Sequence, residues 1–182
     1  KKKSTLKVIH SWQSDKGFRV AKSRNKAIAK SNFEYIILID GDVVLHRKFI
    51  EDHLKHSEYG YFVQGPRVFL NELTTKKFLN TNNIMLSFFA RGLSNRKNTL
   101  HSNFLSSFFS TKKNYLHSIK TCNLAFYKID FIRVNGFNNN IEGWGREDSE
   151  FVVRLLNSGL NRKNVRFQMI QFHLWHQNYS RT

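Results

Sequence analysis

Apolar and polar residues follow one another along this chain in patterns that predict strands and helices in turn. Residues 35–39 (YIILI) form a continuous apolar run, as expected for a central strand covered on both faces. Residues 18–31 and 147–157 carry apolar side chains at helical spacing, and Gly159 is placed to end the second helix. The order strand, helix, strand, helix predicts an α/β sheet.

Weaker patterns fill the rest of the chain. We expect strands over residues 7–12, 60–69, 119–127 and 165–172, and helices over residues 49–57 and 131–134. Two amphipathic stretches lie within residues 74–117. Their apolar residues are Ile84, Met85, Leu86, Phe88, Phe89 and Leu93 in the first, and Leu100, Phe104, Leu105, Phe108 and Phe109 in the second. Neither a repeat nor a low-complexity linker interrupts the chain, so we expect no domain boundary.

The composition excludes several classes of protein. The 182 residues are 40% apolar and include 17 phenylalanines, which argues against a disordered chain because these side chains need burial. No apolar run approaches the roughly 18 residues of a membrane span. A single cysteine, Cys122, excludes a disulfide framework and a cysteine-based zinc site, and it fits a reducing compartment.

The net charge of +17 is distributed unevenly. Residues 1–30 hold ten Lys and Arg with one acid, and residues 73–129 hold nine with no acid. Most acids gather in two islands, between residues 40 and 72 and between residues 142 and 150. This balance suits an anionic partner, which could be nucleic acid, anionic lipid or a phosphorylated small molecule. Solubility alone is the other interpretation.

Asp40 and Asp42 flank Gly41 at the carboxyl end of the predicted strand 35–39. Ligands of open α/β sheets bind at that end of the strands. Two carboxylates so close repel each other unless a cation lies between them. Mg²⁺ or Mn²⁺ takes oxygen ligands and leaves positions for phosphate oxygens. The pattern indicates a divalent-metal site, although a plain Asp-Gly-Asp turn has the same sequence.

The second acidic island, residues 142–148 (EGWGRED), surrounds an aromatic residue. The flanking glycines leave the Trp144 indole with little side-chain bulk beside it, so that one face could stack on the C–H side of a sugar ring. Glu147 and Asp148 then open a predicted helix, where acids also favour the macrodipole. The macrodipole explains the acids but not Gly-Trp-Gly, so the pattern favours a saccharide contact.

His173 and His176 follow the last predicted strand, with Trp175 between them. Imidazole is a good Mn²⁺ ligand and can complete a site begun by carboxylates. Residues three apart on a strand lie on opposite faces, so we expect at most one of the two to be a ligand.

Together these motifs, which occur in the family's order along the chain, resemble a nucleotide-sugar glycosyltransferase of family 2 with the GT-A fold. The C-terminal part resembles a galactosyltransferase-type module. The matching stretches are RNKAIAKS (24–31), YIILIDGDVVLHRKFI (35–50), TCNLAFYK (121–128), NGFNNNIEGWGREDSEFVVRLLNSG (135–159) and FHLWH (172–176). The resemblance implies one domain with a Rossmann-like mixed sheet flanked by helices. Residues 1–70 would be the remainder of the nucleotide-sugar-binding half, and residues 71–182 the acceptor-binding half.

The resemblance also implies a role for each motif. Asp42 would be the direct metal ligand beside Asp40, and His176, in preference to His173, would complete a Mn²⁺ or Mg²⁺ site. Asp148 would be the catalytic base, with Glu147 as its acceptor-binding neighbour. The residues facing a UDP-hexose donor would be Arg24, Asn25, Asp40 and Gly41, and those contacting a saccharide or lipid-linked saccharide acceptor would be Trp144, Gly143 and Asn123. The reaction would be inverting hexose transfer in surface polysaccharide or lipopolysaccharide synthesis.

One part of the family pattern is missing. Family members begin with a strand and a Gly/Ser-rich turn that hold the uracil, whereas this chain opens at about the third strand with Lys1. We therefore expect a sheet that is incomplete at its N-terminal side. The alternatives are a fragment of a longer chain and a catalytically incomplete carbohydrate-binding remnant.

The basic stretches leave two further interpretations. Residues 73–129 could face the anionic inner surface of the cell membrane, where a lipid-linked acceptor waits. The alternative is core helices with solvated lysines. Basic charge with interleaved aromatics is also typical of a nucleic-acid-binding protein, but the clustered carboxylates of the two acidic islands repel phosphate.

Overall fold

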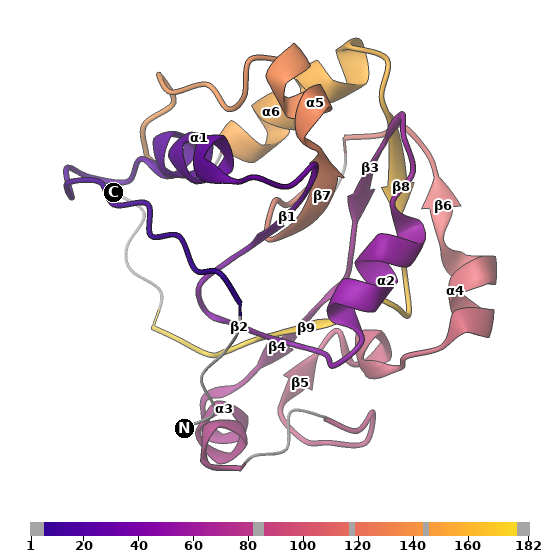
Figure 1. The fold of residues 1–182 in the computed structure, drawn as a ribbon. Coiled ribbons are helices and arrows are strands. Elements are labelled where there is room, and N and C mark those ends of the chain that lie inside the picture. Colours follow the sequence, from indigo (N-terminus) through magenta and orange to yellow (C-terminus); the bar gives the residue numbers. More distant parts are fainter. Residues whose placement is uncertain (1–5, 82–85, 117–118, 144–145, 178–182) are drawn as a thin grey trace.

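The structure, a computed structural model, describes residues 6–81, 86–116, 119–143 and 146–177, and its strands form two mixed sheets (Figure 1). The five-stranded sheet has the order β1 (Tyr35–Ile39), β7 (Asn123–Tyr127), β3 (Tyr61–Gln64), β8 (Asn161–Asn164) and β6 (Thr111–Lys112). The four-stranded sheet has the order β2 (Val43–Leu45), β9 (Gln171–His173), β4 (Arg67–Leu70) and β5 (Leu93–Ser94). Each sheet has one parallel pair, β3 with β8 and β4 with β9, among antiparallel ones.

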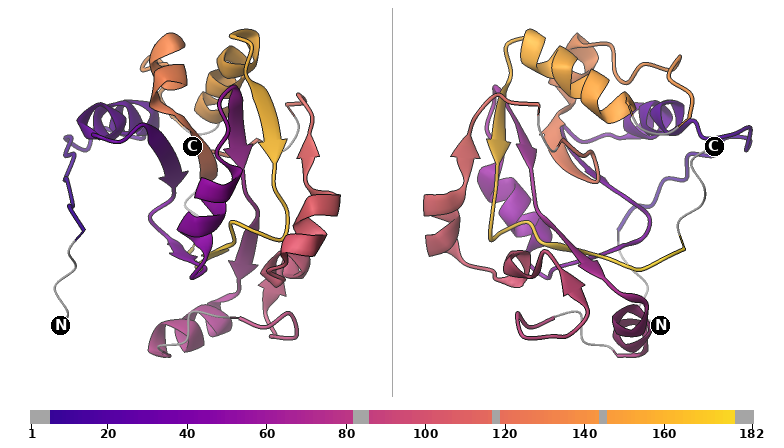
Figure 2. Two further views of the ribbon diagram at one scale, coloured as in Figure 1. Left: turned by 45° about the vertical axis from the view of Figure 1, so that its right-hand side comes forward. Right: turned by 180° about the vertical axis from the view of Figure 1, so that it is seen from behind.

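Helices flank both sheets, as the sequence predicts. Three of them, α1 (Val20–Lys30), α5 (Lys128–Arg133) and α6 (Glu147–Asn157), pack on one face of the five-stranded sheet, at one end of the molecule in both views of Figure 2. The others are α2 (Phe49–His56), α3 (Glu72–Asn80), the short η1 (Arg96–Thr99) and α4 (Asn103–Phe109). No helix in the described ranges is long and apolar enough to cross a membrane.

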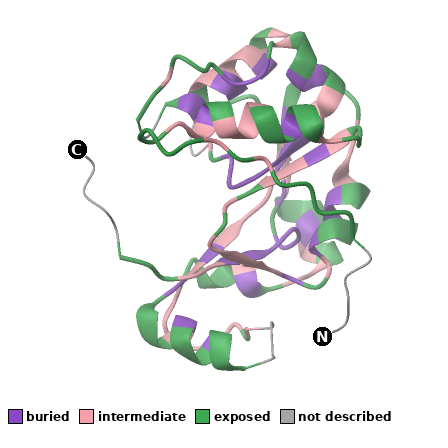
Figure 3. Cartoon of the chain, turned by 60° about the vertical axis from the view of Figure 1, so that its left-hand side comes forward, coloured by how far each residue is buried: buried purple, intermediate pink, exposed green. Residues whose placement is uncertain are grey.

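The main core lies between α6 and the five-stranded sheet. Phe151, Val152 and Leu155 are fully buried and form the apolar stripe that predicted this helix. The Phe151 ring stacks on Phe137 at 4.1 Å and meets Phe126 of β7 edge-on at 5.4 Å. Figure 3 shows the same division, with buried residues where helices meet sheets and exposed ones on the outer faces.

Several predicted strands are shorter or absent. Residues 60–69 split at Gly65-Pro66 into β3 and β4, which belong to different sheets. Residues 165–172 contribute only β9, because Phe167 and Met169 have positive φ angles of 62° and 55°, which no strand accommodates. Residues 7–12 form no strand and are mostly exposed, with Val8 86% exposed.

The run YIILI is a strand, but it does not lie at the centre of its sheet. Within the described part of the chain, β1 pairs only with β7 and therefore forms an edge. Ile39, at its carboxyl end, is 47% exposed. The interpretation of this run as a central strand covered on both faces was wrong.

Asn123 ties the two sheets together where the chain passes between them. At this junction the carbonyls of Pro66 and Met169 need partners outside a strand ladder, and the Asn123 amide donates to both, at 2.9 and 2.8 Å. Its Oδ1 lies 3.0 Å from His53 Nε2 of α2. A Cβ at Gly65 would stand 2.5 Å from the Asn123 amide nitrogen, so the junction requires glycine there.

The burial of His53 makes stability depend on pH. Burial lowers the pKa of His53 from 6.5 to about 4. Between these two pH values only the unfolded chain takes up a proton, so this contribution to stability is complete above pH 6.5 and is lost as the pH falls to about 4. We expect the free energy of unfolding to fall by about 3 kcal/mol over this window.

Urea unfolding at a series of pH values measures this effect. His53→Gln keeps a donor for Asn123 but cannot titrate, so its profile is expected to be flatter than the wild-type profile by that amount. If the free energy of unfolding falls equally with pH in both proteins, the protonation of His53 does not cause the loss.

Candidate active site

The pairing of β2 with β9 brings Asp42 beside the C-terminal histidines. Val43 pairs with His173, and the Leu174 N–H donates to the Asp42 carbonyl at 2.9 Å. The Nε2 atoms of His173 and His176 lie 3.2 and 3.0 Å from Asp42 Oδ2. Asp42 and the two histidines, which are far apart in the sequence, therefore meet at one carboxylate.

Both imidazoles reach Asp42, which corrects the expectation that the two lie on opposite faces of a strand. The assignment of the metal ligands stays a prediction. β9 ends at His173, so the alternation of a strand does not extend to His176. One ligand atom each from Asp42, His173 and His176 lies within 4.8 Å of the others, a grouping that could hold a metal ion. Asp42 Oδ1 is buried and has no hydrogen-bond partner among the described residues. Burial lowers the pKa of His173, which favours the neutral ring that a metal requires.

Asp148 is held in the first turn of α6 by three donors. Arg24 Nη1 lies 2.8 Å from Oδ1, and the Thr121 hydroxyl donates to the same oxygen at 2.5 Å. The Thr121 N–H donates to Oδ2 at 3.0 Å. A carboxylate oxygen can accept about two hydrogen bonds, so Oδ2 has room for one more donor. The Asp148 side chain is 25% exposed, so that donor can come from solvent or a ligand.

Asp40 lies between two arginines and the other carboxylates. Arg24 Nη2 is 3.8 Å from its Oδ1, and Arg67 Nη1 is 3.7 Å from its Oδ2. Burial raises the pKa of Asp40, and the negative charges of Asp42 and Asp148 act in the same direction. The two arginines oppose this rise without cancelling it. Asp40 therefore experiences the negative charges of both Asp42 and Asp148.

Sequence reasoning did not single out Arg67 or Thr121. Arg67 is one of 30 basic residues and stands in no charge pattern, so nothing in the sequence marks it. Thr121 lies in the stretch TCNLAFYK, where it precedes β7 by two residues. Its contacts with Asp148 depend on tertiary packing of β7 against α6.

The remaining predicted residues have different surroundings. Glu147 is 6% exposed, and its Oε1 lies 3.9 Å from Arg24 Nη1. Gly41 and Gly143 are exposed, and Gly143 donates its N–H to the Phe18 carbonyl. Trp144 lies outside the described residues, and its saccharide contact stays a prediction.

The structure gives Asn25 and Asn123 structural contacts instead of open surfaces. The Asn25 side chain accepts from the Phe137 N–H at 2.8 Å and donates to the Phe137 carbonyl at 2.7 Å and to Asn139 Oδ1 at 2.9 Å. Asn123 is 1% exposed with its amide engaged at the sheet junction, so this geometry leaves no surface for an acceptor. The acceptor contact of Asn123 is therefore corrected to a role in packing.

A second group of potential metal ligands, His46, Asp52 and His101, lies near the start of α2. Asp52 accepts from the Met169 N–H at 2.9 Å, and His101 Nε2 lies 3.0 Å from both of its oxygens. His46 Nδ1 accepts from the Lys48 N–H, which leaves the proton of a neutral ring on Nε2 and disfavours metal binding there. This group fixes the loop before β9.

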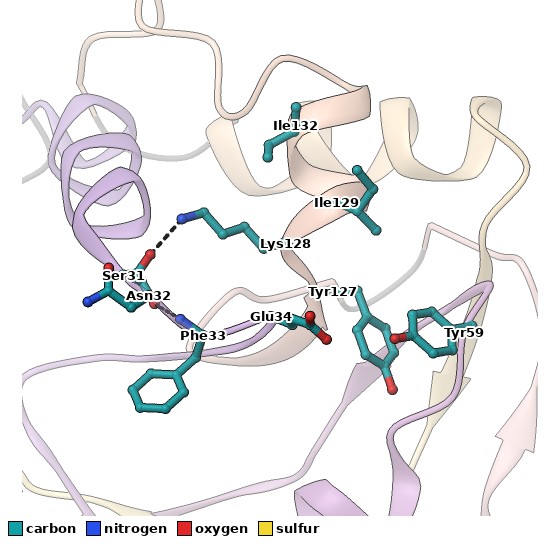
Figure 4. A pocket seen from close by; sticks show the side chains of 9 residues that line it. All are labelled: Ser31, Asn32, Phe33, Glu34, Tyr59, Tyr127, Lys128, Ile129 and Ile132. Atoms are coloured by element: carbon teal, nitrogen blue, oxygen red, sulfur yellow. Dashed lines mark hydrogen bonds between the residues drawn. The ribbon is translucent and has the colours of Figure 1, made fainter.

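The cavity in Figure 4 lies away from the carboxylates. Its volume is about 510 Å³, and it lies at the start of β1, where Tyr59 stacks on Tyr127 at 4.0 Å. Lys128 Nζ donates to the Ser31 carbonyl at its rim. Since Asp40 follows the opposite end of β1, this cavity is separate from the candidate active site.

Two family models match the chain. One, described as glycosyl transferase family 2, matches residues 3–120. The other, described as the N-terminal domain of galactosyltransferase, matches residues 103–177. The first match includes Asp40 and Asp42, and the second includes Asp148 and both histidines. A comparison with curated proteins finds no match.

The contacts of Asn25 generate a prediction. Asn25→Ala removes three hydrogen bonds that hold residues 137–139 against α1, so we expect the free energy of unfolding to fall by about 1–3 kcal/mol. Asn139→Ala, which removes only one of them, is the matched control with a smaller loss. Chemical denaturation measures both. Unchanged stability of Asn25→Ala together with weakened nucleotide binding would instead support the predicted nucleotide contact.

Proposed function

The chain belongs to glycosyl transferase family 2, and we propose that it transfers a hexose from a UDP-hexose to a saccharide hydroxyl with inversion at the anomeric carbon. Membership makes it a glycosyltransferase and implies a nucleotide-sugar donor and an acceptor in general. The hexose, the uridine diphosphate and the inversion are our proposal. The observation that carries it is that Arg24 joins Asp40 and Asp148, and that Asp40 also experiences the negative charge of Asp42, which lies beside both histidines.

We propose that Mn²⁺ or Mg²⁺ binds at Asp42, His173 and His176. A carboxylate with two imidazoles is a donor set that suits Mn²⁺, and the buried, unpartnered Asp42 Oδ1 supports the fit. When bound, the metal supplies positive charge that stabilises the departing diphosphate. Asp40, two residues before Asp42, stays next to this position rather than in the ligand group.

The proposed base is the Oδ2 atom of Asp148. The acceptor hydroxyl attacks the anomeric carbon and transfers its proton to Oδ2, while the bond from that carbon to the diphosphate oxygen breaks. Uridine diphosphate leaves with the electron pair of that bond. Arg24 and the Thr121 N–H and hydroxyl fix the carboxylate in one orientation, which is what a base acting in line with the leaving group needs.

Arg24 and Arg67 are proposed to contact the donor diphosphate. Both guanidinium groups approach Asp40 at distances longer than a hydrogen bond, so neither is tightly bound to that carboxylate. The Arg67 Nε–H is buried and has no partner among the described residues. An arginine fork matches phosphate oxygens, so an incoming diphosphate can take up these donors.

The biological setting is also a proposal. We place the reaction in surface polysaccharide or lipopolysaccharide synthesis, with a lipid-linked saccharide as acceptor at the cytoplasmic face of the membrane. We propose that the chain reaches such an acceptor by peripheral contact with the membrane. The net charge of +17 supports attraction to anionic lipid.

Substitution of the base tests the proposal. Asp148→Asn keeps the shape of the side chain but cannot take up a proton at Oδ2, so we expect hexose transfer to fall by roughly 10²–10⁴-fold while donor binding is retained. Radiolabelled transfer from UDP-hexoses in Mn²⁺ measures the rate, and calorimetry measures donor binding. Glu150→Gln, on the same helix and paired with Arg154, is the matched control and keeps its rate.

Three outcomes would contradict this assignment. Full turnover by Asp148→Asn would show that the base is another group, with Glu147 the next candidate. Saccharide binding without any transfer by the wild-type chain would favour the carbohydrate-binding alternative. A metal-independent gel shift with nucleic acid would favour the interpretation as a nucleic-acid-binding protein.

A further inference from the structure

Helix α4 exposes its aromatic side chains and buries a serine. Phe104, Phe108 and Phe109 are 70%, 71% and 51% exposed, whereas Ser106 is 2% exposed. A helix that packs into a core shows the opposite arrangement, with aromatic residues inside. The second amphipathic stretch therefore forms a helix over Asn103–Phe109, which leaves Leu100 outside, and the three phenylalanines of this helix face outward.

The local structure holds α4 in this orientation. The Ser102 hydroxyl accepts from the Leu105 N–H and caps the helix, and the Ser106 hydroxyl lies 3.1 Å from that of Ser110 beneath it. The Phe109 ring packs edge-on against Phe167 at 5.6 Å. The outward phenylalanines are therefore a fixed feature of the surface. Phe104 and Phe108 contact each other, with ring centres 4.9 Å apart.

Basic residues border this aromatic surface. Lys55 of α2 reaches the first residue of α4, with its Nζ 3.4 Å from Asn103 Oδ1. Arg166 lies next to Phe167 and donates its N–H to Ser110 Oγ, and Lys113 follows shortly after α4 in the chain. All three are exposed. The nearby acid Glu58 is already paired with Lys112 and Lys163, at 3.3 and 2.6 Å.

From this surface we infer that α4 inserts Phe104, Phe108 and Phe109 into the headgroup region of an anionic membrane while the surrounding lysines and Arg166 bind the lipid phosphates. Exposed aromatic rings next to basic side chains match both parts of such a lipid surface. No acid lies between residues 73 and 129, so α4 and the segments next to it in the chain carry no negative side chain. The inference rests on the proposed membrane contact and names the element that makes it.

The membrane contact and the candidate active site are separate in the fold. α4 precedes β6, and Asp40 follows β1; these strands are the two edges of the five-stranded sheet. In Figure 1, α4 and α1 accordingly lie at opposite sides of the molecule. A substitution on the outer face of α4 should therefore leave the carboxylates untouched, and the two proposals can fail independently.

Vesicle co-sedimentation tests the inference. We expect the wild-type chain to bind vesicles of phosphatidylglycerol and phosphatidylcholine, with binding lost at 1 M salt and weak on pure phosphatidylcholine. Phe104→Ser with Phe108→Ser is expected to weaken binding by at least about tenfold, since it removes two inserted rings. Phe33→Ser, a 75% exposed phenylalanine outside α4, is the matched control and binds like the wild type.

Different results overturn different statements. Equal binding by the α4 variant and the wild type would exclude α4 as the inserting element. No binding to anionic vesicles would exclude the membrane contact altogether. Equal binding to neutral and anionic vesicles would exclude the recognition of anionic lipid by the basic residues. Wild-type dimers that dissociate in the α4 variant, without vesicle binding, would show that this surface joins two copies of the chain.

Folding and activity are measured alongside. Circular dichroism and thermal unfolding are expected to match between the α4 variant and the wild type, because Phe104 and Phe108 are largely exposed. Hexose transfer to a soluble acceptor should also be equal in the two proteins. A wild-type chain that binds vesicles but transfers no hexose would refute the proposed activity while leaving the α4 contact in place.

Discussion

The antiparallel pairing of β2 with β9 is the contact on which the candidate active site depends. It joins the segment after β1 to the last strand of the chain, and it sets Val43 opposite His173. Only this register places the Asp42 carboxylate next to both imidazoles. A shift of one residue would turn the His173 side chain to the other face of the sheet and separate the grouping that could hold a metal.

The carboxylates of the site stay close together because arginines lie among them. Asp40, Glu147 and Asp148 all lie within 4 Å of the Arg24 guanidinium, and Arg67 approaches Asp40 from the other side. Without a ligand, these charges compensate one another, although burial still raises the pKa of Asp40. A bound diphosphate would bring negative charge next to the arginines, and a bound cation would bring positive charge next to the carboxylates. The site therefore suits the two ligands together.

Local patterns in the sequence predicted local structure well. The apolar stripe of α6, the helix α1 and the strand character of YIILI depend on neighbouring residues, and each has the predicted type. The break at Gly65-Pro66 has a local signal that the prediction missed, since Gly-Pro marks turns. The break at Phe167 has no such signal in the periodicity. The same holds for Arg67 and Thr121, whose partners come from distant segments. The outward phenylalanines of α4 have the spacing of a core helix, so only the fold distinguishes the two cases.

The most direct test of the account is the binding of Mn²⁺ and uridine diphosphate to the chain, measured by calorimetry. We expect one Mn²⁺ to bind, and uridine diphosphate to bind at least about tenfold more tightly when it is present. Asp42→Asn should lose both effects, whereas His46→Asn, in the second group of potential ligands, should retain them. Mn²⁺ binding that survives in Asp42→Asn, or nucleotide binding that does not depend on Mn²⁺, would contradict the account.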